Sequence, residues 1–331
     1  MIKKAFSVFI ILALLVAGAV LVGGCTQPTT QNVKVIMPFV ASSEWLPVYT
    51  AINQGYYADE GLNVSVEYTS EGGFGSIKQV AAGNAQFGYS GGDSVILARS
   101  QGIPVVSVYQ IDHNNVFGIL TKKSANITKP SDMIGKSIAI SAPGGSVDFS
   151  IKAILKNSGV DSNTVTFVPV GSAVLSMLLS DKTNAMPDHI MFEELLNLQG
   201  VPYNAMTAKD YGANFVTMTL ITSDNTAKNN PDLVKKFVRA TDKGLKYAVA
   251  NPEKSVDDYI SKFNPEAKES RSYEQTYWTR FVKEVIVPTQ YTPGSFNHDQ
   301  WVMTQDMMYN MSFVDKKTDV NALYTTAFLP V

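Results

Sequence analysis

The stretch that decides the fold lies near the start: VKVIM at residues 33–37, PVYTAINQGYY at 47–57 and VSVEY at 64–68. The first and last segments are rich in β-branched residues, which favour strands, and the middle segment has a helical pattern. A strand, a helix and a strand at this spacing predict a right-handed βαβ unit in a parallel sheet.

The alternation continues and then restarts. Two more strands and two helices follow, and near residue 137 a second α/β unit begins, whose helix carries an apolar stripe and ends before Gly159. We expect strands at Gln86–Tyr89, Val105–Tyr109, Ser137–Ser141 and Val165–Val170, and helices at Ser76–Ala82, Asp93–Gln101 and Ser146–Asn157.

The last third is predicted to be helical. Asn230-Pro231 and Asn251-Pro252 each offer an N-cap followed by proline at the first helical position. Because no long linker separates the two α/β units, we expect two extended strands, Val116–Thr121 and Val216–Thr222, to cross between them. The prediction is an α/β protein of two lobes, with residues 33–115 and 222–331 in lobe I, including the C-terminal helices, and 116–221 in lobe II.

The N-terminus resembles an export signal. Lys3 and Lys4 precede an apolar run over residues 5–22, and Gly23, Gly24 and Cys25 follow. This order is typical of a secretory signal peptide over residues 1–24, and the end resembles a lipoprotein signal with Cys25 as the lipidated first mature residue. The alternative is an uncleaved membrane anchor. Both place the body outside the cytoplasm, on a tether formed by residues 25–32.

Composition excludes some classes of function. Of the 27 Lys and Arg residues two leave with the signal, so 25 remain against 29 Asp and Glu, and the mature net charge is −4. That balance disfavours nucleic-acid binding. The single cysteine leaves the body without a disulfide.

Several motifs resemble the extracytoplasmic substrate-binding proteins of ATP-binding-cassette importers. The motifs are GYYADEGLNV at 55–64, LARSQGIPV at 97–105, SDMIGKSI at 131–138 and LYTTAFL at 323–329. They are most similar to the group serving sulfonates, nitrate, taurine and pyrimidine precursors of thiamine. The resemblance implies a type II periplasmic-binding-protein fold, a small-molecule solute, a permease with its ATPase subunits as partners, and a monomer without a cofactor.

Ligand-binding residues are expected where loops follow the strands, because ligands of open α/β sheets bind there. Trp45 is expected to stack on a planar ring of the ligand, and the alternative is that it packs beneath its loop. Asp93 is either a ligand-binding residue or the N-cap of the helix that follows. Glu194 falls where the resemblance places a ligand-contacting glutamate, although it and Asp188 also fit solvated charges. The candidates are Ser43, Glu44, Trp45, Phe74, Ser90, Gly91, Asp93, Asp112, His113, Gly144, Gly145, Asp188 and Glu194.

The charges of these loops favour one class of ligand. Five carboxylates occur in them and no Lys or Arg, whereas a doubly charged anion is normally met by arginine or several ammonium groups. A neutral or cationic nitrogen heterocycle fits better. Backbone amides alone can hold a monoanion, so an aliphatic sulfonate, taurine or nitrate is the alternative.

Nothing in the sequence indicates an enzyme. The three histidines have no metal-ligand spacing, and the Gly-x-Ser-x-Gly and phosphate-loop motifs are absent. The resembling family includes a pyrimidine-precursor synthase with a cysteine-rich motif, which is missing here. A solute sensor that works without a transporter is the remaining alternative, and neighbouring permease and ATPase genes would argue against it.

Overall fold

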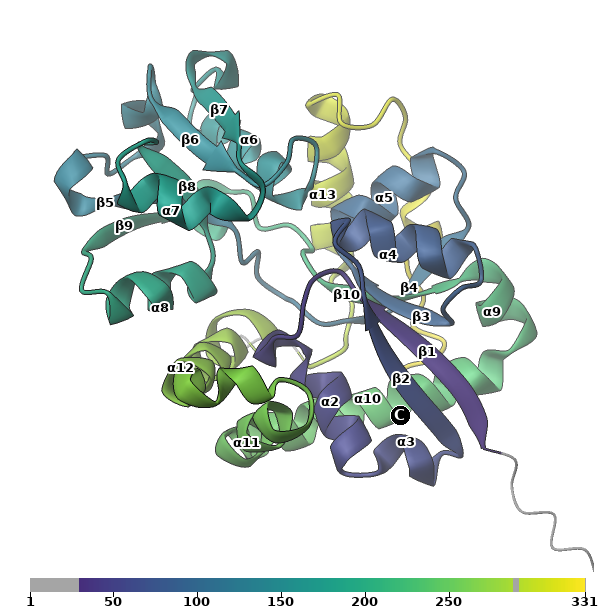
Figure 1. Ribbon diagram of the computed structural model, residues 1–331. Helices are drawn as coiled ribbons and strands as arrows, with labels where there is room; N and C mark the ends of the chain where they lie inside the picture. Colours follow the sequence, from purple (N-terminus) through teal and green to yellow (C-terminus); the bar gives the residue numbers. More distant parts are fainter. Residues whose placement is uncertain (1–29, 288–291, 331) are drawn as a thin grey trace, which may run out of the picture.

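The computed structural model describes residues 30–287 and 292–330, and these form two lobes, each built on a five-stranded sheet (Figure 1). The strand order is β2-β1-β3-β10-β4 in lobe I and β7-β6-β8-β5-β9 in lobe II. The strands are β1 Gln31–Met37, β2 Leu62–Tyr68, β3 Phe87–Ser90, β4 Val105–Gln110, β5 Gly118–Lys122, β6 Ser137–Ile140, β7 Thr166–Pro169, β8 Ala185–Asp188, β9 Tyr203–Thr207 and β10 Thr219–Ser223.

The βαβ unit predicted from residues 33–68 is present. Strands β1 and β2 pair in parallel with Val33 opposite Val64. The expected helix over 47–57 is split into α2, Leu46–Asn53, and α3, Tyr56–Asp59, because Gly55 between them has a left-handed φ of 77°. Strand β1 also begins at Gln31, within the segment expected to be a tether.

Each sheet contains one strand that runs against its neighbours. Strand β10 is antiparallel to β3 and β4, and β5 is antiparallel to β8 and β9. Both strands follow a passage of the chain from the other lobe. The segments expected to cross do leave one lobe and enter the other, but their strand portions begin only at Gly118 and Thr219 and each pairs within a single sheet. The passages themselves, residues 111–117 and 213–218, are not part of either ladder.

The helices cover the sheets and include the long apolar-striped helix α10, whose Leu233, Phe237 and Leu245 are buried as the sequence indicates. Proline begins α10 and α11 as predicted, but Asn230 and Asn251 make no side-chain cap bond. The helices not yet bounded are α4 Gly72–Ala81, α5 Gly92–Ser100, α6 Ser146–Asn157, α7 Val174–Leu179, α8 Ile190–Leu198, α9 Asp224–Asn229, α10 Pro231–Ala250, α11 Pro252–Lys262, α12 Arg271–Phe281 and α13 His298–Asn310.

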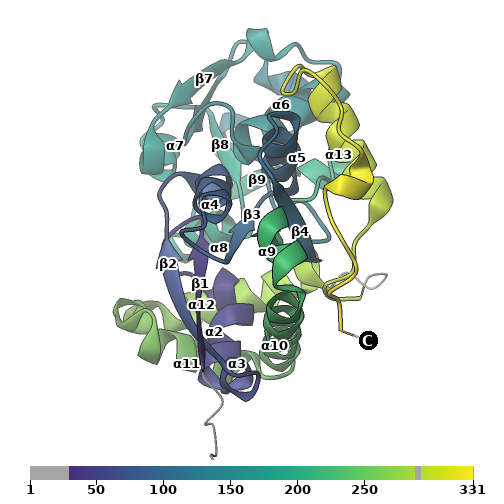
Figure 2. The ribbon, with the colours of Figure 1, turned by 90° about the vertical axis from the view of Figure 1, so that its right-hand side faces the viewer.

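Helix α13 runs alongside both lobes (Figure 2). Its Gln300 side-chain nitrogen donates to backbone carbonyls of both passages, at 3.2 Å to His113 and 2.9 Å to Asn214. Trp301 beside it donates to Gln110 Oε1 at 3.1 Å. These bonds tie α13 to both passages at the place where the chain crosses between the lobes.

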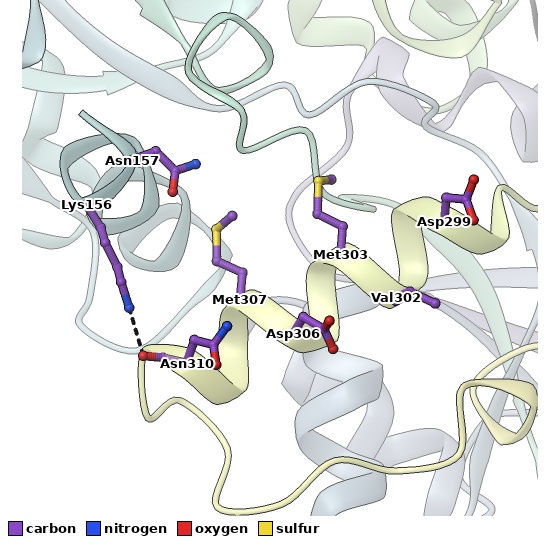
Figure 3. A pocket seen from close by; sticks show the side chains of 8 residues that line it. All are labelled: Lys156, Asn157, Asp299, Val302, Met303, Asp306, Met307 and Asn310. Carbon is purple, nitrogen blue, oxygen red and sulfur yellow. Dashed lines mark hydrogen bonds between the residues drawn. The ribbon is translucent and has the colours of Figure 1, made fainter. Parts of the chain in front are cut away.

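A groove of about 470 Å³ lies between the end of α6 and α13 (Figure 3). The Lys156 ammonium at its edge donates to the Asn310 carbonyl at 2.8 Å. The groove lies away from the carboxyl ends of the strands. Across the described residues, no helix combines the length and the apolar character that a membrane span requires. The proposed signal segment and Cys25 lie outside the described residues.

Candidate functional site

Carboxylates and aromatic rings from both lobes meet where the chain passes between them. We call Glu44, Tyr89, Asp112, His189 and Tyr277 the junction cluster. Glu44 lies in the short 3₁₀ turn Ser43–Trp45 after β1, Asp112 follows β4, and His189 follows β8. Tyr89 belongs to β3, and Tyr277 comes from α12, far along the chain.

The polar atoms of this cluster are only partly paired. The Tyr277 hydroxyl donates to Glu44 Oε2 at 3.1 Å, and the Thr217 hydroxyl donates to Asp112 Oδ2 at 3.0 Å. Within the described part of the chain, Asp112 Oδ1 and the Tyr89 hydroxyl are buried and have no partner. Buried polar atoms without partners are costly, so the cluster is suited to a ligand that supplies hydrogen bonds.

Burial controls the protonation of the cluster. It raises the pKa of Glu44 to about 7, against the smaller opposing effect of the Tyr277 hydrogen bond. Burial raises the pKa of Asp112 well above its usual value, and the nearby Glu44 carboxyl adds to the shift. Burial lowers the pKa of His189 to about 4, so its ring is neutral. At neutral pH the cluster therefore combines a protonated Asp112 carboxyl, a Glu44 carboxyl close to its titration midpoint, hydroxyls and aromatic rings.

A second group of charges joins the lobes beside the cluster. The Arg280 guanidinium of α12 binds Glu194 Oε1 at 2.5 Å and Glu193 Oε2 at 2.6 Å on α8, and Glu284 Oε1 at 3.0 Å. We call these four residues the Arg280 network. Asp188, at the end of β8, has a pKa raised well above normal by burial and by the adjacent Glu193 carboxyl. A cation thus lies where the predicted loops contain none.

The lobes also touch at a second place, through the first turns of α5 and α6. The Ser146 hydroxyl donates to Asp93 Oδ1 at 2.9 Å. Burial raises the pKa of Asp93 to about 6, although this hydrogen bond opposes the shift. Gly91 is the N-cap of α5, so the expectation that Asp93 caps this helix is wrong. The lobe contact accounts for Asp93 instead.

Trp45 does not present the stacking surface that its sequence position suggested. Its side chain is 1% exposed, packs edge-on against Tyr89 with centroids 5.5 Å apart, and donates from Nε1 to the Val40 carbonyl at 3.0 Å. It supports the loop from beneath, which is the packing alternative. The Ser43 hydroxyl is likewise engaged, donating to Glu274 Oε2 at 2.5 Å in the core.

The remaining candidates are dispersed around the junction. The buried Ser90 hydroxyl donates to the Gly73 carbonyl at 3.0 Å, and Phe74 lies partly exposed under the Lys78 ammonium. His113 is buried in the first passage, where its backbone N–H donates to the Val285 carbonyl at 2.9 Å. Gly144 and Gly145 are exposed in the loop before α6.

Sequence reasoning missed the contributions of Tyr89, His189, Tyr277 and Arg280. Tyr277 lies 233 positions from its partner Glu44, and Arg280 lies 87 positions from Glu193. The only available signal was the mixture of aromatic and charged residues in α12, which also fits an ordinary packed helix.

Comparison with known proteins identifies the relatives of this chain. Residues 42–255 match the family described as NMT1/THI5 like. The chain belongs to this family. The riboflavin-binding protein RibY of Chloroflexus aurantiacus is 29% identical over 92% of this chain and 88% of its own length. The formylaminopyrimidine-binding protein of Halalkalibacterium halodurans is 25% identical over 75% of this chain and 77% of its own.

The relatives of this chain also include proteins named as enzymes. A 4-amino-5-hydroxymethyl-2-methylpyrimidine phosphate synthase of Saccharomyces cerevisiae is 26% identical over 75% of each chain. Among solved structures, the periplasmic aliphatic sulphonate binding protein SsuA of Escherichia coli superposes with a TM-score of 0.72 at 14% identity, covering 88% of this chain and 91% of that one. This structure confirms the periplasmic-binding-protein fold and carries no information about the ligand.

Proposed function

We propose that this NMT1/THI5-like protein is the extracytoplasmic solute-binding component of an importer and captures a small nitrogen heterocycle at the junction cluster. The observation that carries the proposal is the pair Glu44 and Asp112, a partly buried and a fully buried carboxyl beside the Tyr89 and Tyr277 rings, with Asp112 Oδ1 lacking a partner among the described residues. Heterocycles offer N–H groups to such carboxyls and a flat face to such rings. The relatives named for riboflavin and formylaminopyrimidine support the same class.

The charges at the junction favour this ligand over a sulfonate. The Arg280 guanidinium is already bound to three carboxylates and is therefore occupied. A sulfonate placed near Glu44 and Asp112 would find no cation there, among the described residues, to neutralise it. It would also have to draw Arg280 away from its partners, at the cost of leaving Glu193 and Glu194 unpaired.

Calorimetry and thermal-shift measurements test the ligand class. Riboflavin and 4-amino-5-hydroxymethyl-2-methylpyrimidine are the heterocyclic probes, and taurine, nitrate and an alkanesulfonate are the anionic ones. We expect a heterocycle to raise the melting temperature, because a ligand that binds only the native state stabilises it. Stabilisation by the anions alone would overturn the heterocycle, and conversion of a probe to product would reveal an enzyme.

A matched pair of variants locates the binding. Glu44→Gln keeps the shape of the side chain but removes its ability to ionise, so heterocycle affinity should change together with its dependence on pH. Asp232→Asn changes an exposed charge on α10 whose carboxyl forms an ion pair with Lys236. It should bind as the wild type does, and equal effects of both variants would place the ligand elsewhere.

Attachment through lipid on Cys25 is part of the same proposal. Its support is the order of basic, apolar and small residues before the cysteine. Mass spectrometry of the protein from membranes should find a modified Cys25 at the N-terminus. Detection of Met1 on the mature chain would contradict this and favour a retained anchor.

A further inference from the structure

His189 is a residue of the junction cluster whose protonation the fold determines. It is the N-cap of α8, and its Nδ1 accepts the Met191 backbone N–H at 3.1 Å. A ring nitrogen that accepts a hydrogen bond carries no proton. Because the ring is neutral, its one proton is on Nε2, and Nε2 is a hydrogen-bond donor.

Aromatic neighbours hold the His189 ring in one orientation. Its centroid lies 5.9 Å from Phe117, 6.0 Å from Tyr277 and 6.4 Å from Phe281. Tyr277 is also the residue whose hydroxyl reaches Glu44. One tyrosine therefore separates a fixed N–H donor in lobe II from the carboxyls of lobe I.

The Nε2–H group has no acceptor among residues 30–287 and 292–330, although His189 retains 8% exposure to solvent. Helix capping accounts for Nδ1 but not for this second nitrogen. Ser, Asn or Asp would cap the helix as well or better and would present no ring. The second nitrogen is thus available to a molecule bound between the lobes.

We propose that His189 is a ligand-binding residue whose Nε2–H donates to a carbonyl oxygen or an unprotonated ring nitrogen of the bound heterocycle. The inference rests on the proposed function and specifies its ligand further. Such a ligand has N–H groups toward Glu44 and Asp112 and an acceptor toward His189. Aliphatic amines, which have no such acceptor, are excluded.

Two substitutions separate the donor from the cap. His189→Ser and His189→Asn both retain a side-chain oxygen for the Met191 N–H and remove the ring nitrogen. We expect near wild-type melting temperatures without ligand and affinities for riboflavin lowered about 10- to 100-fold. Ser223→Ala is the matched control, because it removes the N-cap of α9, where Ser223 Oγ accepts the Thr226 N–H. It should lower the melting temperature and leave affinity unchanged.

Ring nitrogen NMR tests the same group directly. The chain has three histidines, so His189→Asn assigns the His189 signals by their disappearance. The unliganded protein should show the proton on Nε2, and riboflavin should shift that proton and nitrogen. A proton on Nδ1, or unimpaired riboflavin binding by His189→Ser when the wild type binds, would overturn this inference alone. A wild type that binds none of the heterocycles would overturn the proposed function together with it.

Discussion

Two of the contacts between the lobes differ in chemistry. In the Arg280 network one guanidinium binds three carboxylates, and its side chain is 27% exposed. The Asp93–Ser146 contact is a single hydrogen bond between the first turns of two helices, from a carboxyl that burial makes hard to ionise. The strength of the Arg280 network depends on its charges and therefore on the salt concentration, whereas the strength of the Asp93–Ser146 contact depends on pH near 6. The lobes are therefore joined by one contact between charged groups and by one contact whose carboxyl titrates near pH 6.

Removing the charge at the network should have the largest effect. Arg280→Met leaves Glu193 and Glu194 facing each other without a cation, and should lower the free energy of unfolding by about 3 kcal/mol. It should also increase the radius of gyration of the unliganded protein in small-angle scattering. Arg280→Lys keeps the charge but cannot form the same bidentate contacts, so an intermediate loss is expected. An unchanged radius would show that the network does not hold the lobes.

The Gln300 hydrogen bonds to the two passages can be tested separately from the Arg280 network. Gln300→Leu leaves the His113 and Asn214 carbonyls without their donor, and should lower the free energy of unfolding by about 2 kcal/mol. Gln305→Leu on the same helix is the control, since the Gln305 side chain bonds the Thr318 backbone, which belongs to neither passage. Both variants should be less stable, but only Gln300→Leu should change the scattering radius. Equal radii would remove Gln300 from the hinge.

The pH dependence of stability distinguishes the cluster from both contacts. Because the folded protein binds the Glu44 proton up to about pH 7 and the unfolded chain only to about 4.5, stability falls as pH rises through this window. Glu44→Gln should therefore gain about 1 to 2 kcal/mol relative to the wild type between pH 5 and pH 8. Urea unfolding at the two pH values measures this. If the free energy of unfolding depended on pH in the same way in Glu44→Gln and in the wild type, Glu44 would have an ordinary pKa.

The smallest effect is expected at the hydrogen-bonded contact. Ser146→Ala should lower the free energy of unfolding by about 1 kcal/mol, since one hydrogen bond is lost. Asp93→Asn keeps an acceptor for Ser146 and removes the titration, so the loss of stability between about pH 4 and pH 6 should flatten. A pH profile of Asp93→Asn identical to the wild type would mean that this contact does not titrate.

Local patterns were sufficient for most of the fold. Helix α6 has the predicted bounds, and the apolar stripe of α10 is buried, because burial on one face leaves a period that can be read directly. The split at Gly55 escaped prediction, since a single left-handed residue interrupts a helix without changing its apolar pattern. Glu44 and Asp112 could be placed near the junction from the sequence, because each lies in the segment that follows a predicted strand.

The sequence by itself determined the alternation of strands and helices, the family resemblance and the acidic character of the loops. Only the tertiary structure decided which side chains meet. It buried Trp45 beneath its loop, brought Tyr277 to Glu44 across 233 positions, and gave Arg280 three carboxylate partners. The physical reason is that periodicity records the side of an element that is buried, whereas pairs between distant elements depend on how whole lobes pack. The position of the proton on the His189 ring was also decided by the tertiary structure, because it depends on the Met191 N–H and on the surrounding rings together.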